Sequence, residues 1–314
     1  MRSFAGKLVR LVVVLLVLTM VSFFAQSLLP GDPAQLIVLS NDKAKIEETR
    51  RDLGLDRPVI ARYVDWLGDF VTGDMGTYYR SRGGTPGEKV AEALPTSILL
   101  MIYCQIVALL IAIPLGVVAA YRANSLFDRS ANIAVFLALS VPGFVVAYLL
   151  KKYLALDSRL LPESGWVAFT DDPAEHIRHA ILPVLALVSS QIAVYFRLLR
   201  SDMIATLQED FITMAKAKGL RPRRILFRHA LRPSSLTLLT VAGLNVGTLI
   251  SAAVLVERIF KVPGMGYLLV EGVLSREYPA TQSMIALIGI LFVLVNFAVD
   301  SLYSVLDPRI RHAR

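Results

Sequence analysis

The sequence contains few cysteines and few charged residues, the residue types on which disulfide-linked and soluble proteins respectively depend. It holds a single cysteine, Cys104, so a disulfide within the chain and a metal site built from several cysteines are both excluded. Charged residues make up only 18% of its 314 residues, whereas hydrophobic residues make up 55%. A soluble domain of this composition would expose large apolar patches. The composition therefore predicts an all-α integral membrane protein.

Motifs for nucleotide binding and catalysis are also missing. No segment matches the P-loop pattern G-x-x-x-x-G-K-[ST] or the hydrolase pattern G-x-S-x-G. His176 and His179 lie near Glu175, but the H-E-x-x-H spacing of zinc proteases is absent. We therefore expect no catalytic residue, metal or cofactor in this chain, with a membrane metalloprotease kept as an alternative.

The net charge of +8 does not indicate a nucleic-acid partner, because basic and acidic residues occur in blocks between long apolar runs. A membrane-spanning helix needs about 20 residues. Six runs are long enough, near Leu8–Leu29, Leu94–Ala120, Ile133–Leu150, Ile181–Leu199, Leu236–Val256 and Met284–Leu306. The sequence thus predicts six spans in one transmembrane domain, 1–314, with membrane lipid around it.

The charge distribution orients these spans. If the N-terminus is cytoplasmic, the inner segments carry seventeen basic residues against five acidic ones, and the outer loops sixteen against nineteen. Basic residues are enriched on the cytoplasmic side of membrane proteins. Both termini are therefore expected in the cytoplasm. A cleaved signal peptide at the first span is the less favoured alternative.

The stretch 30–93 is too long and polar for a simple connector. Helical spacing over 42–53 and 59–71 places Tyr63, Trp66 and Phe70 on one face. We expect a small extracytoplasmic cap of helices whose aromatic stripe serves packing.

Several polar or helix-breaking residues lie within the apolar runs. Pro142 with Gly143 interrupts the hydrogen bonding of the third run and is expected to kink its helix. Gln191 and Asn245 lie at mid-membrane depth in the fourth and fifth runs. Buried amides in lipid need partners, so they either join helices or line a wet pathway. Pro142, Gln191 and Asn245 are candidates for the pathway.

The longest basic segment, 201–232, separates the fourth and fifth runs. Asp210 is a suitable N-cap for a short helix over 211–218, and Gly219 suits its left-handed end. Such a helix is unstable alone and needs something to pack against. Two interpretations stay open from the pattern itself, a basic loop held by lipid headgroups or a docking site for a soluble partner.

Glu209 to Leu220, followed by Arg228-His229-Ala230-Leu231-Arg232-Pro233, resembles the cytoplasmic loop of ABC-importer permeases, and in particular the first permease subunit of the peptide/nickel family. Leu29 to Ala34, Ser140 to Phe144 and Val262 to Gly266 are similar to that subunit as well, so the likeness runs nearly end to end. One departure is Thr213-Met214-Ala215, which stands where the general motif has Glu-Ala-Ala.

The resemblance implies that the short helix is a coupling helix docked on a cytoplasmic ATPase. The residues implied in that contact are Glu209, Asp210, Phe211, Met214, Ala215, Ala217, Gly219, Leu220 and Arg224. It further implies a second homologous permease, two P-loop ATPases that bind ATP and Mg²⁺, an extracytoplasmic solute-binding protein, and the plasma (inner) membrane of a bacterium or archaeon. The alternative is a secondary transporter, for which Asp300 is the one clearly embedded acid.

Overall fold

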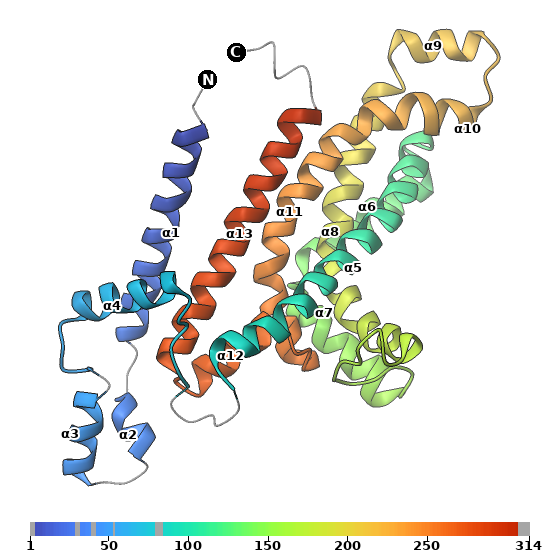
Figure 1. Cartoon of the computed structure of the whole chain (residues 1–314). Helices are drawn as coiled ribbons and strands as arrows, with labels where there is room; N and C mark the ends of the chain where they lie inside the picture. Colours follow the sequence, from blue (N-terminus) through green and yellow to red (C-terminus); the bar gives the residue numbers. More distant parts are fainter. Residues whose placement is uncertain (1–3, 29–31, 39–41, 53, 79–83, 307–314) are drawn as a thin grey trace. The chain divides into compact units, whose positions relative to one another are not determined.

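The computed structural model describes residues 4–28, 32–38, 42–52, 54–78 and 84–306, and every regular element in those ranges is helical (Figure 1). It divides into two compact units. The first contains the chain up to Thr96 together with Pro263–Leu294, and the second centres on Ser97–Val262. One permease domain over 1–314 stays a prediction.

The second unit contains most of the apolar runs. Its helices are α5 (Pro86–Tyr121, from Ser97 onward), α6 (Leu126–Ser140), α7 (Gly143–Leu150), the π-helix η1 (Lys151–Asp157), α8 (Pro173–Thr206), α9 (Asp210–Ala217), α10 (Pro222–Arg224), the π-helix η2 (Ile225–Ala230) and α11 (Leu231–Phe260). Helix α8 is central, because α6, α7 and α11 all pack against it. Its side chains Tyr195, Phe196 and Leu199 are fully buried.

The third predicted run is broken rather than merely kinked. Helices α6 and α7 with η1 meet at an angle of 99° at Val141-Pro142. Proline lacks the N–H that would continue the helix, and Pro142 instead caps α7. The pair forms either one broken span or a re-entrant segment.

The first unit contains α1 (Phe4–Ser27), α2 (Pro33–Val38), α3 (Lys43–Asp52), α4 (Val59–Thr72), α12 (Met265–Leu274) and α13 (Tyr278–Leu306) as far as Leu294. The expected helices over 42–53 and 59–71 are confirmed as α3 and α4, whereas α2 and α12 were not predicted. Tyr63 and Trp66 of α4 pack with Phe23 of α1 and Ala286 of α13. The aromatic stripe therefore serves packing, as expected.

Four described helices are long and apolar enough to cross a membrane, and the bent pair makes a possible fifth. The four lie over Pro86–Tyr121, Pro173–Thr206, Pro222–Phe260 and Pro279–Ala298, and α1 adds a shorter apolar helix over Leu11–Ser27. The chain is therefore an all-α multi-pass membrane protein. The count of six spans stays a prediction.

Candidate functional site

Helix α9 ends as its sequence predicts. Gly219 has a left-handed φ of 72°, its N–H donates to the Lys216 carbonyl at 2.9 Å, and the Leu220 N–H donates to the Ala215 carbonyl at 3.3 Å. These two hydrogen bonds define a Schellman motif. A residue with a Cβ adopts this φ at an energetic cost, which explains the glycine.

The start of α9 differs from the prediction by one residue. Glu209 occupies the N-cap position with extended backbone, and its side chain makes no capping hydrogen bond. Asp210, predicted as the cap, is the first helical residue. Its carboxylate still lies in the first turn, where the helix dipole favours negative charge.

The short helix has one buried face and one exposed face. Ile212 is fully buried and Ala215 nearly so, and α9 packs through this face toward η2. Phe211 and Met214 are 45% and 59% exposed. Ala215, which is among the residues implied in the ATPase contact, therefore faces the protein interior. Ile212, which the prediction omitted, is the anchor.

The other predicted coupling residues lie around this exposed face. Glu209, Asp210, Ala217, Gly219 and Arg224 are exposed, and Leu220 is half-buried. After the turn, α10 begins with Pro222 at its first position and continues into η2 and α11. Lys216, Lys218, Arg221 and Arg223 are exposed as well. An apolar patch thus lies within a rim that is mostly basic.

The two long helices on either side of the loop are joined at its base. A hydrogen bond of 2.9 Å connects Thr206, the last residue of α8, with Ser234 in the first turn of α11. Ser234 also donates to the Ala230 carbonyl at 2.9 Å. In Figure 1, α9 stands beyond the joined ends of α8 and α11. The loop is therefore held at its base by a contact between these two helices.

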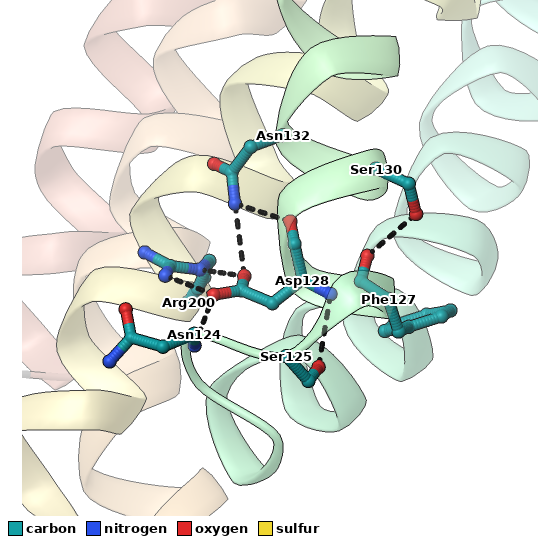
Figure 2. A network of polar contacts seen from close by, with 7 residues as sticks. All are labelled: Asn124, Ser125, Phe127, Asp128, Ser130, Asn132 and Arg200. Atoms are coloured by element: carbon teal, nitrogen blue, oxygen red, sulfur yellow. Dashed lines mark hydrogen bonds and ion pairs between the residues drawn. The ribbon is translucent and has the colours of Figure 1, made fainter.

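An ion pair with a buried carboxylate joins α8 to α6 close to this base. Arg200 Nε and Nη2 donate to the two carboxylate oxygens of Asp128 at 2.5 and 2.6 Å (Figure 2). The Asn132 side chain and the Asn124 backbone N–H donate to the same carboxylate at 2.9 and 2.8 Å. Asp128 is only 2% exposed, so its charge depends on these partners. We call Asp128, Arg200, Asn124 and Asn132 the ionic clasp.

Sequence reasoning missed the ionic clasp. Asp128 and Arg200 are 72 residues apart, and each resembles an ordinary charge near the end of a span. The available signal was weak, namely an arginine directly after the fourth apolar run.

The mid-membrane candidates are placed differently from one another. Gln191 is buried, and its Oε1 is among the buried side-chain atoms of the described chain that have no hydrogen-bond partner. One turn along α8, the Tyr195 hydroxyl donates to Gln105 Oε1 at 3.2 Å. Asn245 of α11 is half-buried. Pro142 is exposed at the break between α6 and α7.

His176 and His179 both make hydrogen bonds within the protein. His176 is fully buried, with Nδ1 2.6 Å from the Val167 carbonyl and Nε2 3.0 Å from the Tyr103 hydroxyl. His179 Nδ1 lies 2.9 Å from the Glu175 carbonyl. Both ring nitrogens of His176 are thus engaged, and no group of three metal-ligating side chains occurs among the described residues. The side chain of Asp300 lies outside the described part of the chain.

Comparison with known proteins gives a consistent result. Residues 112–312 match the family described as binding-protein-dependent transport system inner membrane component, and 1–83 match its N-terminal model. The chain is 34% identical over 302 residues to the oligopeptide transport system permease protein AppB of Bacillus subtilis, covering 95% of this chain and 96% of that one. It is 35% identical over 302 residues to a Brucella abortus protein whose name marks it as a candidate peptide transport system permease, with 95% of each chain covered.

A solved structure shares the fold. A chain of the MetNI methionine ABC transporter in an inward-facing conformation superposes with a TM-score of 0.57 at 14% identity, covering 70% of this chain and 96% of that one. This likeness concerns the fold alone. The family matches extend over more than half of the sequence and include the loop that contains α9. The chain therefore belongs to the family of binding-protein-dependent transport system inner membrane components and is the permease of an ABC importer.

Proposed function

We propose that this permease imports peptides or peptide-like solutes, and that α9 is its docking site for a cytoplasmic ATPase. The observation that carries the docking assignment is the division of α9 into an anchored face at Ile212 and an exposed face at Phe211 and Met214. Exposed aromatic and methionine side chains are typical of binding hot spots. The exposed arginines beside them suit an acidic rim on the partner.

The base of the loop explains how motion would be transmitted. The Thr206–Ser234 hydrogen bond and the burial of Ile212 hold α9 to α8 and α11, so displacement of α9 would carry both helices with it. The ATP and Mg²⁺ chemistry belongs to the partners, and this chain contributes mechanical coupling.

The remaining partners follow from the family resemblance and from the names of the relatives. The proposed assembly has a second homologous permease, two P-loop ATPases and an extracytoplasmic solute-binding protein. The excess of basic residues on the α9 side supports a cytoplasmic location for this loop and for both termini, in a plasma (inner) membrane. Gln191, whose buried oxygen has no partner among the described residues, is the strongest candidate for the translocation pathway.

The test replaces Gly219 with proline. Proline requires a φ near −65° and has no N–H, so Gly219→Pro removes both the left-handed turn and the bond to Lys216. We expect ATPase co-purification with the membrane-inserted chain and ATP-dependent uptake of labelled peptides each to fall by about tenfold or more, which is 1.4 kcal/mol or more of binding energy.

The matched control is Gly219→Asn, because asparagine tolerates the left-handed conformation better than other residues. It should retain most of the uptake. Normal ATPase association and uptake by Gly219→Pro would remove the coupling assignment. Uptake by the unaltered assembly that survives ATP depletion but stops with a proton uncoupler would favour the secondary transporter.

A further inference from the structure

Helix α4 has an apolar stripe beside the face that packs into its own unit. Ile60, Val64 and Val71 are 68%, 59% and 76% exposed. At 3.6 residues per turn, these three positions fall within about 40° of one another around the helix axis. The stripe contains only aliphatic side chains.

The neighbouring face of α4 is firmly anchored. Trp66 Nε1 donates to Ser283 Oγ of α13 at 3.2 Å, and the Tyr63 hydroxyl lies 3.0 Å from Thr19 Oγ1 of α1. Both rings are buried. The orientation of α4 about its own axis is therefore fixed, and the stripe points away from α1 and α13.

These contacts also give the depth of α4. Among the described residues, the stretch of α13 that is long and apolar enough to cross a membrane begins at Pro279, so Ser283 lies about 6 Å along it at 1.5 Å per residue. Thr19 lies eight residues before Ser27, the last residue of α1, or about 12 Å from that end. Helix α4 therefore crosses both helices about one to two turns inside their ends.

The opposite side of α4 is polar. Asp69 is exposed, and Asp65 forms an ion pair with Arg57 at 2.5 Å on the helix's other flank. An apolar face combined with a charged face is typical of helices that lie in the membrane interface.

We infer that α4 is an interfacial helix whose stripe Ile60, Val64 and Val71 inserts among lipid acyl chains. A protein partner is disfavoured because binding hot spots are rich in aromatic residues and arginine, and α4 directs Tyr63 and Trp66 into its own unit. The polar stretch after α1 is then tied to the bilayer surface as well as to α1 and α13. This inference does not depend on the role of α9.

The test measures the surroundings of α4 with spin labels. Cys104 is fully buried, so single cysteines introduced as Val64→Cys, Val71→Cys and Asp69→Cys can be labelled selectively in the whole chain. The chain is reconstituted in phosphatidylethanolamine and phosphatidylglycerol vesicles. Collisions with oxygen, which concentrates in lipid, are compared with collisions with a water-soluble nickel chelate.

Labels at Val64 and Val71 should be several-fold more accessible to oxygen than to the nickel chelate, with a depth of about 5–10 Å. The label at Asp69 should show the reverse preference. Nickel accessibility at Val64 and Val71 equal to that at Asp69 would overturn the inference, since the stripe would then face water. Low accessibility to both reagents would overturn it too, because protein would then cover the stripe.

Discussion

Helices α4 and α9 are both short, both amphipathic and both closed by a Schellman turn, yet they are held differently. At Gly73 the turn after α4 repeats the bonds seen at Gly219, with Gly73 N–H to Phe70 O at 3.1 Å and Asp74 N–H to Asp69 O at 2.9 Å. Helix α4 turns its hydrogen-bonded aromatics inward, whereas α9 turns its one aromatic outward.

This difference suits α4 to anchoring within its own unit and α9 to docking with a partner. Trp66 and Tyr63 are buried and stabilise α4 within its own unit. These aromatic side chains are therefore not available for contact with a protein partner. Helix α9 is held by Ile212 and Ala215 and keeps Phe211 and Met214 exposed. Helix α9 has only eight residues and two buried side chains, so it is not stable on its own. Its position therefore depends on the packing of α8, the helix that precedes it.

The largest loss of stability is expected from a change in the ionic clasp, which joins α8 to α6 near the base of α9. Arg200→Ala leaves the buried Asp128 carboxylate without its charge partner, and the free energy of unfolding should fall by about 3–5 kcal/mol. Thermal unfolding in detergent measures this. Arg197→Ala is the control, because Arg197 is exposed over the Phe136 ring and should cost less than about 1 kcal/mol. Equal losses in the two variants would contradict a stabilising role for the ionic clasp.

A smaller loss is expected for the anchor of α4. Trp66→Ala removes a buried ring and its hydrogen bond to Ser283, which should cost about 3 kcal/mol. Trp66→Phe retains most of the ring and should cost about 1 kcal/mol. Thermal unfolding again measures both. The folded fraction of each variant should still bind the ATPase. Loss of ATPase binding would contradict the proposal that α4 and α9 have separate roles.

The smallest effect on stability is expected on the outer face of α9. Replacing Phe211 and Met214 together with serine should change the free energy of unfolding by less than about 0.5 kcal/mol, because both side chains are exposed. ATPase co-purification should nevertheless be lost. Thr213→Ala, an exposed change on the same helix, should leave it intact. Retained association in the double variant would place the docking surface elsewhere.

Local features of the fold were predictable because their causes are local. The apolar runs, the helices α3 and α4, and the glycine turn at Gly219 each follow from residues within a few positions of one another. The break at Pro142 was anticipated as a kink, but its angle of 99° was not, since packing of α7 on α8 determines it.

Features that join distant segments were not predictable. The ionic clasp between Asp128 and Arg200 depends on helix packing and leaves no periodic signal in the sequence. The inward turn of Ile212 and the outward turn of Phe211 follow from where η2 lies, and both residues are equally apolar.

The sequence by itself determined the membrane class, the approximate positions of the apolar helices and the short capped helix in the basic loop, because composition, hydrophobic run length and turn chemistry act over neighbouring residues. The tertiary structure decided which face of each short helix is free. Exposure depends on what packs against a residue, and the contacts that bury Ile212 and Trp66 come from segments the sequence does not place beside them.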